Sequence, residues 1–252
     1  MMMWKVRETT RSQRYDAEPF ALRGGVCGQD GLAQDFDYLP GLCRRKLGTR
    51  VRGVFRVQLE GCGLRCADCS LASAGRVSKP SLYSSDRLIE AFIGSGQDVF
   101  DLAGGSPARE LAHWHEIVDE LPGVFHSHFL LTERAYDAKV LDRLARFTNI
   151  VCGVSIEGLT PRGYLDRTGV RLDSGLFWDN LARLRESGLP IYLAFNQPDP
   201  RYSSAFLDQI TDRFGVDILE CASEIARKRN LIELRAAGRD TDARDHRLEA
   251  AG

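Results

Sequence analysis

Short apolar runs alternate with amphipathic stretches from residue 54 to residue 219, and this alternation constrains the fold more than any other feature. We expect six strands, at Val54–Glu60, Val99–Ala103, Phe129–Thr132, Ile150–Ile156, Pro190–Phe195 and Val216–Leu219. A helical pattern lies between each consecutive pair of these runs. Repeated strand–helix units favour parallel strands joined by right-handed crossovers. The sequence therefore predicts an α/β fold, a partial (βα)6 barrel like part of a TIM barrel, with a mostly parallel sheet.

Capping residues mark where several of the expected helices begin and end. Ser85 is the expected N-cap of one helix. Ser106 is the expected cap of the next helix, and Pro107 would then take its first position. Gly188 is placed to end the helix that carries Phe177, which supports the same alternation.

The chain divides into three expected regions. Residues 1–47 are polar and contain many glycines, and we expect them to form an extension that packs on the core. Residues 48–235 would form the barrel as a single domain. Residues 236–252 are rich in Arg, Asp, Ala and Gly, a composition typical of a disordered tail.

Three cysteines follow the first expected strand with the spacing C-x3-C-x2-C, at Cys62, Cys66 and Cys69. Three thiolates on one short loop can bind three irons of a cubane iron–sulfur cluster. No fourth cysteine lies nearby, so one iron would remain open to a ligand that the protein does not supply. An open iron on a reducible cluster indicates chemistry at the metal.

A zinc site is the alternative for these cysteines. Structural zinc takes four ligands, usually as two close pairs. The other cysteines, Cys27, Cys43, Cys152 and Cys221, are isolated in the sequence, and no nearby histidine completes a second pair. The spacing therefore favours the iron–sulfur cluster.

Composition restricts the class of protein. The formal net charge is −1, which gives no basic field for nucleic acid or an anionic membrane. No apolar run is long enough to span a membrane, and the N-terminus lacks the apolar segment of a signal peptide. Seven cysteines in such a chain indicate reduced thiols and a metal site, so we expect a cytoplasmic protein with neither membrane nor nucleic acid as a partner.

The cysteine loop resembles that of the radical S-adenosylmethionine (SAM) superfamily. The resemblance implies a [4Fe–4S] cluster held by Cys62, Cys66 and Cys69, with SAM chelated to the open iron. In that family the cluster reduces SAM, and the resulting 5′-deoxyadenosyl radical abstracts a hydrogen atom from the substrate. The segment from Gly61 to Cys66 is also similar to the cluster loop of glycyl-radical activases. Asp68 stands where the family usually has an aromatic residue.

The expected loop after the second strand carries Gly104, Gly105, Ser106 and Pro107. Loops after parallel strands share one edge of a sheet, so this loop and the cysteine loop should meet there. The segment resembles the Gly-Gly-Glu-Pro motif with which radical SAM enzymes hold the amino group of SAM. Ser106 replaces the glutamate, which removes a charged contact and leaves the backbone carbonyls available.

Two further segments at the same expected edge of the sheet carry candidate contacts to SAM. Ser155 and Glu157 end the fourth expected strand on one face, and they match the Ser-x-Asp-Gly segment of many radical SAM enzymes. A solvated strand end is the other interpretation of Glu157. Gln197 follows the fifth strand, where its amide is suited to hydrogen-bond a ribose or a polar substrate.

Several other polar residues have a structural interpretation or remain open. Glu133, which follows the third expected strand, is a candidate to face a polar substrate or to form a surface ion pair. The pair His126 and His128 could share a strand face, but the sequence shows no third ligand, so we interpret it as structural. Cys221 follows the sixth strand and is a candidate hydrogen-atom donor to a substrate radical. The alternative for Cys221 is a buried apolar residue.

These observations together predict an oxidoreductase of the radical SAM type that acts on a small polar metabolite or biosynthetic intermediate. The reaction could be a dehydrogenation, a rearrangement or an epimerisation. An electron donor such as flavodoxin or ferredoxin would be its partner. Two alternatives stay open: an activase that acts on a glycyl-radical partner protein, and a non-catalytic metal-binding module. The activases usually carry Asp-x-Lys near the position of Glu157, and this chain has no lysine there.

Overall fold

The computed structural model describes residues 2–6, 21–23, 53–59, 61–66, 81–158, 160–195, 200–215 and 231–233. Cys69, Gln197 and Cys221 lie outside these residues, as do the strand expected at Val216–Leu219 and the tail expected at 236–252.

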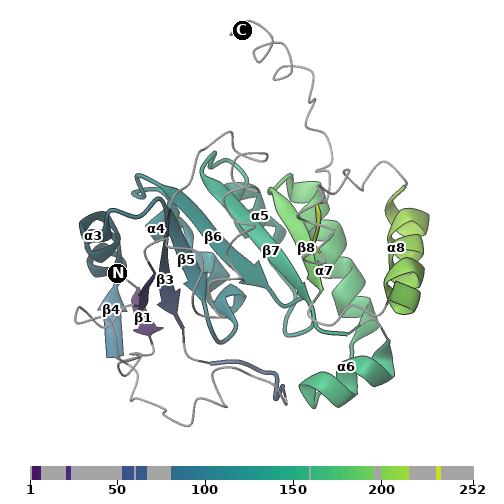
Figure 1. The fold of residues 1–252 in the computed structure, drawn as a ribbon. Coiled ribbons are helices and arrows are strands. Elements are labelled where there is room, and N and C mark those ends of the chain that lie inside the picture. The colour runs from purple at the N-terminus through teal and green to yellow at the C-terminus, as the bar shows by residue number, and fades with distance from the viewer. Residues whose placement is uncertain are drawn as a thin grey trace, which may run out of the picture.

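Seven strands form the main sheet in the order β2-β3-β5-β6-β7-β8-β9 (Figure 1). Their bounds are β2 Ala21–Arg23, β3 Val54–Gln58, β5 Val99–Ala103, β6 Val124–Phe129, β7 Ile150–Ile156, β8 Ile191–Phe195 and β9 Leu231–Glu233. The five from β3 to β8 are parallel, whereas the edge strands β2 and β9 are antiparallel to their neighbours. The mostly parallel sheet is confirmed. The strand pairings leave β2 and β9 at opposite edges, so they do not show a closed barrel among the described strands.

A second, two-stranded sheet joins the N-terminal segment to the core. Strand β1, Met3–Val6, pairs antiparallel with β4, Ser81–Ser84. The indole of Trp4 is completely buried and donates a hydrogen bond of 3.0 Å to Ser85 Oγ. This part of the N-terminal segment therefore contributes to the hydrophobic core.

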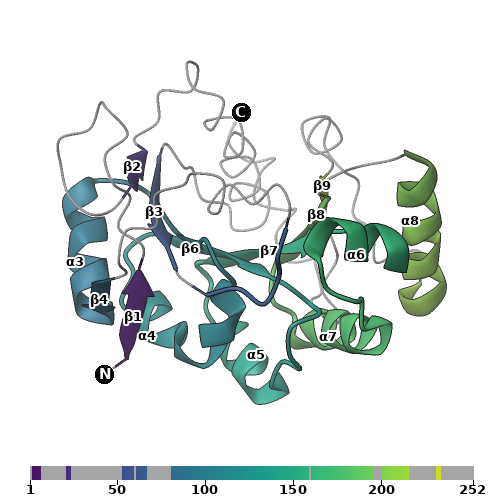
Figure 2. The ribbon, with the colours of Figure 1, turned by 90° about the horizontal axis from the view of Figure 1, so that it is seen from below.

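The described helices alternate with the parallel strands. They are α3 Ser85–Ser95, the 3-10 helix η2 Pro107–His113, α4 His115–Val118, α5 Ala138–Leu144, α6 Pro161–Thr168, α7 Ser174–Ser187 and α8 Pro200–Phe214. Helices α4, α5 and α7 lie on one side of the sheet (Figure 2). This arrangement confirms the α/β class.

The two faces of the sheet differ in chemistry. One face carries Phe55, Phe100 and Phe125, whose rings contact one another and, with Phe92 and Trp114, form part of the apolar core. Because side chains alternate along a strand, the residue that follows each of these phenylalanines points to the opposite face. That opposite face, called the polar face below, carries Arg56, Asp101, His126, His128, Ser155 and Tyr192.

Two local predictions were wrong, and a third was correct in position only. The third strand lies at Val124–Phe129 instead of Phe129–Thr132, because it carries polar side chains on one face and so lacks a continuous apolar run. Ser84, rather than Ser85, caps α3 by accepting a hydrogen bond from the Arg87 N–H, and Ser85 is the first helical residue. Ser106 takes the N-cap position of η2 and Pro107 its first position, as expected, but the Ser106 side chain makes no capping hydrogen bond.

Candidate functional site

The cysteine loop lies at the carboxyl ends of the parallel strands. It leaves β3 after Leu59, whose N–H donates a hydrogen bond of 2.7 Å to the carbonyl of Ala103 at the end of β5. The Ser106 N–H donates a bond of 2.7 Å back to the carbonyl of Gly61. The two loops that the sequence placed at one edge of the sheet are therefore hydrogen-bonded to each other.

A third element holds the far side of the cysteine loop. The Arg65 N–H donates a hydrogen bond of 2.7 Å to the carbonyl of Thr168, the last residue of α6. Gly169 follows with a φ of 66°, and a Cβ at that position would lie 3.2 Å from Arg65 Cβ. The segment 61–66 is thus fixed between the β5 loop and the end of α6.

Glu133 joins the cysteine loop to Ser106. Its carboxylate accepts a hydrogen bond of 2.5 Å from the Gly63 N–H through Oε1, and Oε2 accepts a bond from the hydroxyl of Ser106. The sequence identified Ser106 as a helix cap and Glu133 as a separate rim residue. The hydrogen bond between them places the Glu133 carboxylate beside Ser106. A negative charge therefore lies next to the residue that replaces the glutamate of the Gly-Gly-Glu-Pro motif.

The two described cysteines of the loop are accessible thiols. Cys62 is exposed and Cys66 is partly buried. The Leu64 N–H donates to Cys62 Sγ over 3.4 Å, and backbone N–H groups of this kind stabilise cluster-bound sulfur. Cys152 differs, because it is completely buried in β7 and this burial raises the pKa of its thiol well above the usual value. The structure thus separates the loop cysteines from a packing cysteine.

Backbone conformation explains Gly104 and Gly105. Both have positive φ values, 70° and 47°, which side-chain-bearing residues rarely adopt. A Cβ on Gly104 would lie 3.1 Å from both Gln58 Cα and the carbonyl oxygen of Leu59. The loop therefore needs glycine at 104 to approach β3 so closely.

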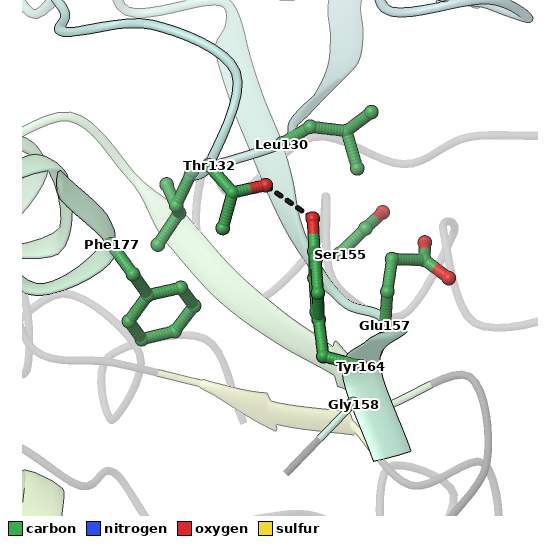
Figure 3. Close-up of a pocket in the computed structure, with 8 residues that line it drawn as sticks. Leu130, Thr132, Ser155, Glu157, Gly158, Tyr164 and Phe177 are labelled. Atoms are coloured by element: carbon green, nitrogen blue, oxygen red, sulfur yellow. Dashed lines mark hydrogen bonds between the residues drawn. The ribbon is translucent and has the colours of Figure 1, made fainter. Parts of the chain in front are cut away.

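Ser155 and Glu157 lie beside a small pocket at the ends of β6 and β7 (Figure 3). The hydroxyls of Thr132 and Tyr164 face each other in a hydrogen bond across this pocket. Glu157 accepts a hydrogen bond of 3.1 Å from Arg167 Nε and is only 10% exposed, so the interpretation as a solvated strand end is wrong. The structure brings Ser155 and Glu157 to the same edge of the sheet as the cysteine loop.

A network on the polar face was missed by the sequence analysis. Asp101 accepts hydrogen bonds of 2.7 Å from both Arg56 Nε and His126 Nδ1. His126 Nε2 lies 2.8 Å from the hydroxyl oxygen of Tyr192. Strands β3, β5 and β6 place Arg56, Asp101 and His126 in register. A polar residue inside each of these apolar runs was the signal available in the sequence; the register that joins the three residues was not.

Burial and charge set the ionisation of this network. Burial by itself would raise the pKa of Asp101, but the Arg56 guanidinium and the His126 hydrogen bond outweigh it and hold that pKa well below its usual range. Burial, which the Asp101 anion opposes only in part, is the main cause that lowers the pKa of His128 to about 3. Asp101 is therefore an anion and His128 a neutral imidazole near pH 7.

The structure supplies a third possible metal ligand beside His126 and His128, which the sequence did not show: Asp101. One ligand atom each from Asp101, His126 and His128 lies within 4.8 Å of the others, close enough for a metal ion. Arg56 bonds the same carboxylate, however, and adds a positive charge beside any cation. The electrostatics therefore disfavour a divalent metal at this cluster.

Comparisons with known proteins give limited similarity. No protein-family model matches the chain, and no curated protein matches it. Streptococcus suis SuiB bound to the precursor peptide SuiA aligns with a TM-score of 0.46 and 15% identity over 62% of this chain and 36% of SuiB. SuiB bound to S-adenosylmethionine aligns with a TM-score of 0.33 and 14% identity over 61% of this chain and 43% of SuiB.

Both TM-scores lie below 0.5, and the chain spans less than half the length of either SuiB chain. Neither similarity therefore assigns a family or a function to this chain. Among the described helices, none is both long and apolar enough to cross a membrane.

Proposed function

We propose that this protein is a radical SAM enzyme. The observation that carries the proposal is the anchored cysteine loop at the carboxyl edge of a parallel sheet. Hydrogen bonds tie this loop to the β5 loop, to Glu133 and to the end of α6. The described segment 61–66, fixed on three sides, holds Cys62 and Cys66 at the edge where α/β folds bind ligands.

Cys62, Cys66 and Cys69 would hold a [4Fe–4S] cluster. The described part of the loop fits such a group, because both thiols are accessible and a backbone N–H is directed at Cys62 Sγ. When bound, the cluster supplies the electron that cleaves SAM to methionine and a 5′-deoxyadenosyl radical. The role of the chain is to hold the thiolates, to orient SAM and to exclude water.

The Gly104–Pro107 loop would bind the amino group of SAM. Glu133 supports this placement, because its carboxylate gives the loop the negative charge that Ser106 lacks. An ammonium group beside this carboxylate and the loop carbonyls would gain charge-assisted hydrogen bonds. Ser155, Glu157 and Gln197 would contact the rest of SAM from the ends of β7 and β8.

The substrate would be a small polar metabolite or biosynthetic intermediate that lies over the polar face. Arg56, His128 and Ser155 on that face suit a polar ligand better than an apolar one. A flavodoxin or ferredoxin would supply electrons in the cytoplasm. Action on a glycyl-radical protein and a non-catalytic role remain the alternatives, and no feature of the described site favours either.

Anaerobic reconstitution tests the cofactor part of this proposal. We expect about four irons per chain, and an EPR signal of the reduced protein that changes when SAM is added. A metal content of zinc, with no spectral response to SAM, would support the metal-binding module instead. Cys27→Ala is the matched control and should leave the iron content unchanged.

A further inference from the structure

Asp101, His126 and Tyr192 form a continuous hydrogen-bonded chain on the polar face. The carboxylate of Asp101 is ionised and can only accept hydrogen bonds, so the proton of the His126 ring lies on Nδ1. When the ring is neutral, Nε2 is the acceptor, and the hydroxyl of Tyr192, 2.8 Å away, is placed to donate to it. A proton that moved from Tyr192 to His126 would form an imidazolium next to the Asp101 anion, which stabilises it.

Tyr192 differs in this respect from the other buried tyrosines that the structure describes. The hydroxyl of Tyr136 donates to the carbonyl of Leu130, and that of Tyr164 pairs with the hydroxyl of Thr132. Neither partner takes up a proton near neutral pH. Tyr192 alone among the three has a basic partner, and its side chain is completely buried.

These two properties suit one-electron oxidation. A phenol that loses an electron becomes a very strong acid, so oxidation is easy only where a base within hydrogen-bond distance takes the proton. Burial protects the resulting phenoxyl radical from solvent. We propose that Tyr192 is a redox-active tyrosine that gives its proton to His126 when it is oxidised by one electron.

The role of Tyr192 in the reaction rests on the proposed radical SAM function. Tyr192 loses one electron to a carbon-centred radical formed over the polar face, its O–H bond breaks, and an N–H bond forms at His126 Nε2. The carbon radical gains that electron and a proton from solvent, and ends as a C–H bond. A one-electron donor of the flavodoxin or ferredoxin class then reduces the tyrosyl radical, and the proton returns from His126.

Gly153 gives the hydroxyl of Tyr192 its space. A Cβ on Gly153 would lie 2.9 Å from the Tyr192 hydroxyl oxygen and 2.6 Å from His128 Nδ1. A larger residue there would clash with both side chains, so His128 or the phenol of Tyr192 would have to shift. The sequence Cys152-Gly153-Val154 in the middle of β7 is thus explained by the network and not by strand formation, which glycine weakens.

Photo-oxidation of the intact protein with tris(bipyridine)ruthenium(III) tests the proposal without cluster, SAM or substrate. We expect a long-lived tyrosyl EPR signal that is lost in Tyr192→Phe and retained in the matched variants Tyr164→Phe and Tyr136→Phe. In His126→Gln the tyrosine keeps a hydrogen-bond partner but loses the base, and oxidation should slow by about a hundredfold. Equal signals in Tyr192→Phe and wild type would overturn the proposal.

A labelled tyrosine keeps the test decisive if the Tyr192→Phe variant does not fold. Difluorotyrosine placed at position 192 retains the hydroxyl, and fluorine splitting should then appear in the EPR signal of the radical. The same residue placed at position 164 is the control and should add no splitting. Splitting from 164, or from neither position, would contradict the assignment. Failure of SAM cleavage would leave these outcomes unchanged, so the two proposals can fail separately.

Discussion

The stability of the protein should fall steeply as the pH is lowered from 6.5 to 4.5, and His128 should cause most of that fall. The pKa of His128 drops from 6.5 to about 3 in the folded protein, mainly because the ring is buried. The unfolded chain therefore binds a proton in this range that the folded chain does not. Stability from a depressed pKa is complete above the unfolded value and is lost as the pH falls toward the folded value.

The magnitude follows from the pKa difference. Each pKa unit corresponds to about 1.36 kcal/mol, so two pH units below 6.5 should cost about 2–3 kcal/mol of unfolding free energy. That is a large share of the roughly 5–15 kcal/mol that stabilises a typical domain. Asp101 and Glu116 also have lowered pKa values, but their contributions are lost only below about pH 4.5.

Urea unfolding of the reduced apoprotein at several pH values measures this effect. We expect His128→Gln to remove most of the pH dependence between 6.5 and 4.5, because glutamine does not titrate. His115→Gln, on α4, is the matched control and should keep the wild-type profile. Parallel profiles for wild type and His128→Gln would refute the reasoning.

Three further predictions concern the candidate site. Glu133→Gln keeps the acceptor for Gly63 but removes the charge, so SAM affinity measured by calorimetry on the reconstituted protein should fall about tenfold, or about 1.4 kcal/mol; unchanged affinity would remove Glu133 from the SAM site. Gly104→Ala should cost about 1–3 kcal/mol in urea unfolding because its φ is positive and its Cβ would crowd β3, whereas Gly94→Ala, which meets no atom within 4 Å, should not destabilise the protein. If Cys221, instead of Tyr192, quenches the substrate radical, Cys221→Ala should leave 5′-deoxyadenosine formation intact and stop or divert product formation, with deuterium incorporation from heavy water as the readout. Product formation equal to wild type would make Cys221 a packing residue.

The sequence predicted strands in which a single polar residue interrupts the apolar run. The run Ile150–Ile156 has the same bounds as β7, and Val99–Ala103 coincides with β5. Strand β6 was misplaced because His126 and His128 interrupt its apolar pattern. Hydrophobic periodicity failed in β6 because three consecutive residues, 126–128, are polar, whereas the other strands of the network carry isolated polar residues.

The candidate site was predictable only in part, for a different physical reason. Cys62, Cys66 and the two glycines of the β5 loop were found because local spacing identifies them. The pairing of Glu133 with Ser106 joins residues 27 positions apart, and no local pattern indicates it. The same holds for Tyr192 and His126, which are 66 positions apart. Such contacts depend on the register of the parallel strands, which a single sequence does not specify.

Formation of 5′-deoxyadenosine tests the central claim most directly. The anaerobically reconstituted protein, reduced with dithionite and supplied with SAM, should release 5′-deoxyadenosine and methionine in equal amounts. Separate replacement of Cys62, Cys66 or Cys69 by alanine should abolish this release, whereas Cys43→Ala should retain it. Release that persists without any one of the three loop cysteines, or no release from the iron-loaded wild type, would contradict the account.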